Sequence, residues 1–112
     1  MIMNICKIMT MYFIVLLLFY VIHSNLNRFI ISILLYIFSI IIFNIDYKLG
    51  CLYFLVGIGA ALTEHVFIKY ITLSWDYRKP NFLTIPFWLM PLWGIAIILI
   101  MEIDAIFKTI VN

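Results

Sequence analysis

Glu64 is the residue of this sequence with the clearest chemical potential, because it is an acid inside a long apolar stretch. If that stretch forms one helix over 49–73, its centre lies near Ala61, and Glu64 lies within about one turn of it. A charge at the centre of a membrane costs about 2.5–3.5 kcal/mol, so we expect Glu64 to face other helices, to have a partner or to be protonated. A helix that ends at Ile68 would instead leave Glu64 about one turn from water, as an end residue reaching for the surface.

Small residues share the face of Glu64, at spacings of three and four residues: Gly57, Ala60 and Ala61. Gly57 and Ala61 have the small-xxx-small spacing that lets membrane helices approach closely. We therefore expect this face to pack against another helix. His65 lies about 100° further around the helix, so it is a candidate for lining a cavity, and we expect no metal there.

Two prolines, Pro86 and Pro91, lie inside a later apolar stretch and could break its helix. Each removes a backbone donor and clashes with the carbonyl one turn back. Broken membrane helices often line cavities, which makes Trp88, Pro91 and Trp93 candidates for contacting a substrate. The alternatives are a kinked helix that forms only a wall, or a Pro86 in the first helical turn with Pro91 as the only kink.

The longest polar break carries aromatic and basic residues together. Trp75 and Tyr77 are typical of anchors at a membrane interface, and Arg78 and Lys79 of side chains at the headgroup level. The alternative is that Asp76 or Arg78 folds back to pair with the membrane acid or to gate a cavity.

Motifs for well-known chemistries are absent from the sequence. It has no potassium-filter, P-loop, HExxH or GxSxG sequence. Cys6 and Cys51 belong to no CxxC or Cys/His cluster, so we expect two buried free thiols, no bound metal and no cofactor. An enzyme is therefore not the preferred interpretation.

The composition indicates whether water or lipid surrounds the folded chain. Of its 112 residues, 68% are apolar and 11% charged, whereas a soluble domain has about half and about a quarter. A compact domain of this size cannot bury that much apolar surface. The composition therefore excludes a soluble enzyme, a disordered tail and a disulfide scaffold. The net charge of +2 is scattered, which argues against nucleic-acid binding. We expect the lipid bilayer to be the main partner.

Four continuous apolar stretches are separated by short polar breaks. Each has about the 20 residues that a helix needs to cross a bilayer, and backbone groups in lipid must be satisfied within the helix. Short breaks favour antiparallel neighbours, so we predict an all-α integral membrane protein with four transmembrane helices in an up-down bundle. The first stretch lacks a small-residue cleavage site and is interpreted as a retained helix. The predicted helices span about 5–22, 26–45, 49–70 and 82–101.

Two features of the topology stay open. Residues 102–112 form either an amphipathic helix on the membrane surface or an extension of the fourth helix. Lys and Arg divide three to four between the two sides, so the orientation is weakly specified and insertion in both orientations is compatible with the sequence.

The composition also carries a hint of origin and a resemblance. With 24 Ile, four Ala and no Gln, the chain is typical of an AT-rich genome, such as that of a giant virus, an endosymbiont or a streamlined bacterium. Its C-terminal half resembles small uncharacterised membrane proteins of bacteria and viruses, which implies a shared four-helix fold and no particular activity. The residues that carry this likeness run from Glu64 through Trp75-x-Tyr77 to Ile85-Pro-x-Trp88-Leu-x-Pro91-x-Trp93-Gly94.

In size and helix number the chain also resembles the small multidrug resistance transporters. That family has its essential Glu in the first helix, where this sequence has no acid, so the site is not carried over.

The resulting expectation is a multi-pass membrane protein without a catalytic motif, in the plasma membrane or a host or virion membrane. We expect a homo-oligomer, because four helices enclose little volume. Two alternatives use Glu64: a small proton-coupled transporter or channel, and a membrane enzyme for a lipid or isoprenoid with Glu64 as general acid and Trp88 and Trp93 holding the substrate.

Overall fold

The computed structural model describes residues 2–71 and 85–111, and these form four α-helices. The predicted all-α class is confirmed, and each of these helices is long and apolar enough to cross a membrane. A π-helical turn, η1 (Phe67–Ile71), continues the third helix. The helices are α1 (Ile2–Val21), α2 (Asn25–Ile42), α3 (Tyr47–Val66) and α4 (Leu89–Val111).

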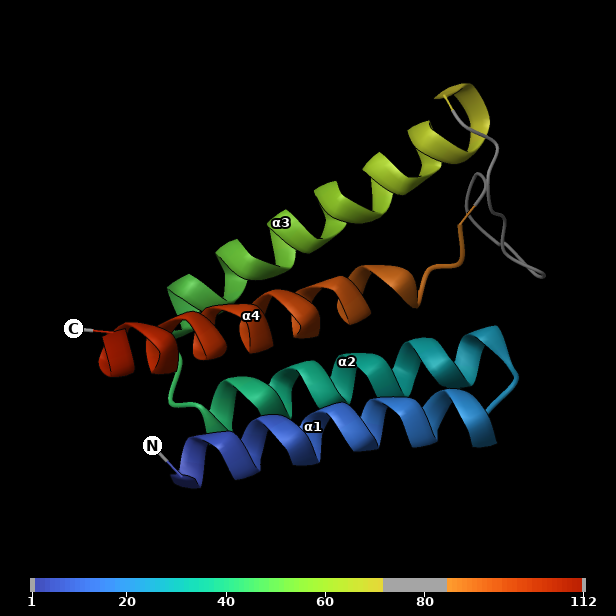
Figure 1. The fold of residues 1–112 in the computed structure, drawn as a ribbon. Coiled ribbons are helices and arrows are strands. Elements are labelled where there is room, and N and C mark those ends of the chain that lie inside the picture. Colours follow the sequence, from blue (N-terminus) through green and yellow to red (C-terminus); the bar gives the residue numbers. More distant parts are fainter. Residues whose placement is uncertain (1, 72–84, 112) are drawn as a thin grey trace.

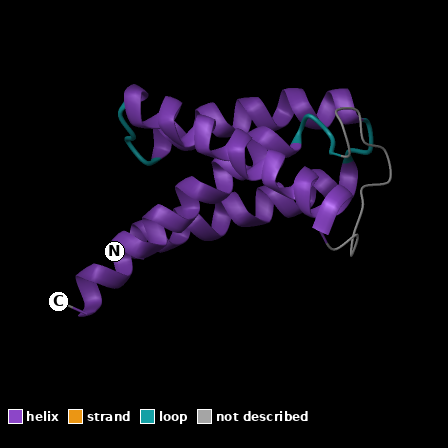
Figure 2. Cartoon of the chain, turned by 90° about the horizontal axis from the view of Figure 1, so that it is seen from above, coloured by secondary structure: helices purple, strands orange, loops and turns teal. Residues whose placement is uncertain are grey.

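Consecutive helices run in opposite directions, and both termini lie at the same end of the bundle (Figure 1). Helix α4 lies between α3 and the α1–α2 pair, and it contacts all three of these helices. Figure 2 shows the same bundle from above, again with the N and C ends near each other. The ends of α1 and α3 therefore meet the start of α2 and of α4 at the opposite end, which we call the Glu64 end.

The helix ends are stabilised by donors from neighbouring elements. Lys7 on α1 donates to the carbonyl of Ile42 at the end of α2, over 2.9 Å. Asn44 follows α2 with a φ of 54°, a left-handed conformation that Asn tolerates better than most residues. Carbonyl groups at helix ends lack intrahelical donors, so such contacts let the chain turn sharply between antiparallel helices.

Two glycines bring α3 and α4 into backbone contact. A Cβ atom on Gly57 would lie 2.8 Å from the backbone nitrogen of Gly94 and 3.1 Å from the carbonyl oxygen of Met90. A Cβ atom on Gly94 would in turn lie 2.7 Å from the ring of Tyr36 on α2. Gly57 and Ala61 are both buried, so the small-residue face of α3 lies against α4.

The fourth helix differs from the predicted span of 82–101. It begins at Leu89, so Pro86 precedes the helix and Pro91 lies in its first turn. A proline in a first turn removes a donor that has no intrahelical partner anyway. The carbonyl of Phe87, one turn before Pro91, accepts from the backbone nitrogen of Met90 over 3.2 Å. The expected break or kink at these prolines in the interior of a helix is therefore contradicted.

The end of α4 decides between the two alternatives for residues 102–112. The helix continues without interruption to Val111, so 102–111 extend the fourth helix and do not form a separate surface helix. Lys108 pairs with Asp104 over 3.0 Å, at the i,i+4 spacing that supports an exposed helix.

Helix α2 turns its polar side chains inward. Its buried residues are Ser32, Tyr36 and Ser39, spaced four and three residues apart on one face. The Tyr36 hydroxyl donates to the carbonyl of Gly50, and the Ser39 hydroxyl donates to the carbonyl of Leu35 over 2.8 Å. The opposite face consists of exposed large apolar residues, namely Leu26, Ile30, Leu34, Ile37, Phe38 and Ile41.

Candidate functional site

The structure joins Glu64 to Trp93 across the interface of α3 and α4. The indole Nε1 of Trp93 donates a hydrogen bond to Oε2 of Glu64. Helical side chains lean toward the N-terminus of their own helix, and α3 and α4 are antiparallel, so these two side chains lean toward each other. Of the candidates named from sequence, Glu64 and Trp93 are thus brought together.

Glu64 lies between the centre and the end of the apolar helical span that contains it. The apolar span that contains it runs from Tyr47 to Tyr70, so its centre lies near Ile58 and Gly59. Glu64 is then about 8 Å, or about one and a half turns, from that centre. This position along the helix falls between the two alternatives that the sequence left open.

Glu64 and Trp93 line an open groove of about 510 Å³, whose other described lining residues are Ala60, Thr63 and Phe67. The hydroxyl of Thr63 donates to the carbonyl of Gly59 over 2.8 Å, so the hydroxyl oxygen keeps only acceptor capacity toward the groove. Ala60 thus lines the groove, whereas Gly57 and Ala61 lie in the helix contact.

His65 and Trp88 lie elsewhere. The ring of His65 packs edge-on against Tyr70 of η1, with ring centroids 6.2 Å apart. Neither residue is among the described residues that line the groove. Within residues 2–71 and 85–111 no three His, Cys, Asp or Glu side chains are close enough together to hold a metal ion.

Trp88 belongs to a second cluster at the Glu64 end. Its indole nitrogen donates to Oδ1 of Asn25 over 3.0 Å, and its ring packs 4.8 Å from that of Phe19. The guanidinium of Arg28 lies 5.0 Å from the Phe19 ring centroid and 5.4 Å from that of Trp88. Arg28 also donates to the carbonyls of Phe19 and Ile22 at the end of α1.

Sequence reasoning did not identify this Arg28 cluster. The available signal was the position of Arg28 on the first turn of one helix, directly after the end of another whose last carbonyls need donors. Trp88 therefore has a packing role in the structure, and the substrate contact considered from sequence stays a prediction.

Two expectations from the sequence need comment. Cys6 and Cys51 are both exposed, so the prediction of buried thiols is wrong, because both side chains lie on helix faces that no described neighbour covers. The anchors Trp75, Tyr77, Arg78 and Lys79, together with Asp76, lie outside the described residues.

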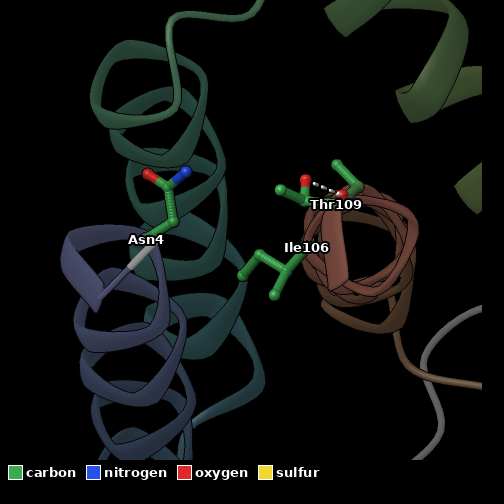
Figure 3. A pocket seen from close by; sticks show the side chains of 4 residues that line it. Asn4, Ile106 and Thr109 are labelled. Carbon is green, nitrogen blue, oxygen red and sulfur yellow. Dashed lines mark hydrogen bonds between the residues drawn. The ribbon is translucent and has the colours of Figure 1, made fainter. Parts of the chain in front are cut away.

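Two smaller cavities lie at the opposite end, between the start of α1 and the end of α4. One has about 130 Å³ and is lined by Asn4, Ala105, Ile106 and Thr109 (Figure 3). The other has about 240 Å³ and is lined by apolar side chains alone: Ile5, Ile8, Met9, Ile103 and Ile106. Neither has an ionisable side chain among these lining residues.

The chain matches no protein-family model, no curated protein and no solved structure.

The chemistry available in the groove is that of one carboxyl group. Glu64 is the one ionisable side chain among the described lining residues, and the hydroxyl of Thr63 beside it donates to the carbonyl of Gly59. Covalent catalysis by a hydroxyl requires a base that accepts its proton, and glycoside hydrolysis commonly uses two carboxyl groups. A single carboxyl group can instead take up and release a proton, or bind a cation.

Proposed function

We propose that this chain is an integral membrane protein that crosses the bilayer four times, with α1 to α4 as the spans. The inverted polarity of α2 is the observation that carries the proposal. Its inner face holds Ser32, Tyr36 and Ser39, while Leu34 is 59% exposed and Ile41 64% exposed on the outer face. A helix of a water-soluble bundle has the reverse arrangement, with its apolar stripe toward the core.

The other helices support the same proposal. Only 17% of the residues of the best apolar window are buried in each of α1, α2 and α3, and 28% in α4. Exposed apolar surface of this extent is unfavourable in water, at about 25 cal/mol for each Å², and carries no such cost in a hydrocarbon solvent. Lipid contact with the outer faces removes that cost without any further protein.

The experiment separates membranes from cells that express the tagged chain and washes them with alkaline carbonate. We expect the chain to stay in the membrane pellet and to dissolve only with detergent. A chain released by carbonate, or one that is monomeric and folded in buffer without detergent, would overturn the proposal.

We propose proton-coupled transport as the activity of this membrane protein, with Glu64 as the residue that carries the proton. The supporting observation is the position of its carboxylate, which accepts a hydrogen bond from Trp93. Glu64 lies within an apolar span and lines an open groove. Ionisable groups at such places are costly and commonly serve ion or proton movement.

This second proposal is tested in liposomes that contain the purified chain and a pH-sensitive dye. We expect a proton flux across the liposome membrane that depends on pH and that Glu64→Gln abolishes, since glutamine cannot exchange a proton. Glu102→Gln is the matched control, because Glu102 is the other glutamate of the sequence and does not line the groove. Equal flux with Glu64→Gln and with the unchanged chain would refute a role of Glu64 in transport.

A further inference from the structure

We infer that the Arg28 cluster binds the phosphate group of an anionic phospholipid, with the acyl chains along the outer faces of α1 and α2. The cluster consists of Arg28 and the rings of Phe19 and Trp88 beside it. This inference rests on the proposed membrane location, and it adds a site at which the protein selects among the lipids around it.

Arg28 has donor capacity beyond the contacts that stabilise the end of α1. A guanidinium has five N–H bonds. Nε donates to the carbonyl of Ile22 and Nη2 donates to the carbonyl of Phe19, so two of the five are used. Nη1 donates to no group of residues 2–71 and 85–111, and the side chain is half-buried rather than enclosed. The remaining N–H bonds of such a planar group suit the oxygens of a phosphate.

The positive charge of Arg28 is only partly compensated. Among the described residues no carboxylate forms an ion pair with it. The end of α1 offsets part of the charge, because a helix C-terminus carries about −0.5 of an elementary charge. The rings of Phe19 and Trp88, with centroids 5.0 and 5.4 Å from the guanidinium, attract the cation but bring no net charge. An anion beside Arg28 would supply the missing negative charge.

The position of the cluster favours a lipid as the source of this anion. Arg28 lies three residues after the start of α2, about 4.5 Å along the helix, where a spanning helix enters the headgroup region. Leu26 and Ile30 on α2 and Val21 at the end of α1 are exposed apolar residues at the same end. A ligand that fits both features has a phosphate at Arg28 and alkyl chains beside these residues. A zwitterionic lipid carries a cation in its own headgroup, so we expect an anionic phospholipid to bind more strongly.

The test measures how lipids quench the fluorescence of Trp88, which lies beside Arg28. Trp75→Phe and Trp93→Phe leave Trp88 as the one tryptophan of the chain, and this reference chain is placed in nanodiscs of phosphatidylcholine. Brominated phosphatidylglycerol or brominated phosphatidylcholine, with bromine at the same acyl position, then replaces part of the lipid. We expect phosphatidylglycerol to associate beside Trp88 about fivefold more strongly, the scale expected for one basic residue near an anionic surface.

Variants of the reference chain assign this preference to Arg28. Arg28→Gln should abolish the preference, because glutamine carries no charge. Lys69→Gln is the matched control, since it removes one positive charge from η1 at the same end of the bundle, and the preference should remain. Inorganic phosphate, added at matched ionic strength, should not reduce the preference, because it lacks the alkyl chains that hold a lipid beside the cluster.

Four results would overturn the inference. They are equal association of the two lipids with the reference chain, an unchanged preference in Arg28→Gln, an equal loss in Lys69→Gln and in Arg28→Gln, and loss of the preference in inorganic phosphate, which would identify the free ion as the ligand. The first result applies even if Arg28→Gln does not fold.

Failure of the membrane proposal has a different signature, namely release of the chain by carbonate. A chain that stays in membranes but associates equally with both lipids refutes the lipid site alone.

Discussion

Gly57→Ala should destabilise the bundle, and Gly59→Ala should not. The added methyl group at position 57 would lie 2.8 Å from the backbone nitrogen of Gly94, and a backbone atom cannot move aside as a flexible side chain can. At position 59 the methyl group meets nothing within 4 Å. The two glycines lie two residues apart on the same helix, so they form a matched pair.

The magnitude follows from two opposing contributions. Replacing glycine by alanine inside a helix stabilises it by about 0.5–1 kcal/mol, and this applies to both variants. Overpacking a close contact costs about 1–3 kcal/mol, and this applies to Gly57→Ala alone. The difference between the variants therefore isolates the overpacking cost, and we expect Gly57→Ala to be less stable than Gly59→Ala by about 1–3 kcal/mol.

Unfolding by SDS in mixed micelles, followed by circular dichroism, measures both free energies of unfolding. A difference below about 0.5 kcal/mol, the usual range for substitutions without contacts, would refute the close crossing of α3 and α4. So would a lower stability for Gly59→Ala than for Gly57→Ala.

Two further predictions concern the opposite ends of the bundle. Arg28→Gln should lower the free energy of unfolding by about 1–3 kcal/mol, because it removes charged hydrogen bonds to the last carbonyls of α1. Lys48→Gln is the control, since Lys48 is exposed. Equal stability of the two variants would contradict the role of Arg28. Cys6 and Cys51 each lie four residues after the start of their helix, at the same end of the bundle and both exposed. A nitroxide spin label on either thiol should therefore lie at the same depth in the bilayer, with equal accessibility to oxygen and to a water-soluble nickel chelate. A clear difference between the two labels would contradict the up-down arrangement.

The existence of the helices could be predicted from sequence because it depends on local composition. Each apolar stretch is long enough to span a bilayer, and polar residues such as Asn44 and Asp46 mark the turns between them. The start of α4 could not be predicted in the same way. Hydropathy is equally high for Ile85 and for Leu89, and only the backbone shows that the helix begins after the first proline. A helix start at Leu89 turns Pro91 from an expected kink into an ordinary first-turn residue.

The candidate site was predictable to the extent that it depends on one helix. The spacing of Gly57, Ala61 and Glu64 indicates a shared face, and the structure buries the two small residues against α4. Which residue of α4 meets Glu64 depends on how the helices cross, and no local pattern specifies that register. Trp93 therefore emerged as the partner only from the structure, although the sequence had named it as a residue that contacts a substrate.

The glycine contact and the Glu64 groove are consequences of one crossing. Helices in backbone contact at one point diverge to either side of it, because their axes cross at an angle. Gly57 and Glu64 are seven residues apart, which places them on nearly the same face and about 10 Å apart along α3. Space therefore opens between the helices where the carboxylate lies, and the long side chain of Trp93 crosses it from the residue next to Gly94. The close approach that stabilises the bundle thus also fixes the width of the groove, and any substitution that separates Gly57 from Gly94 acts on both.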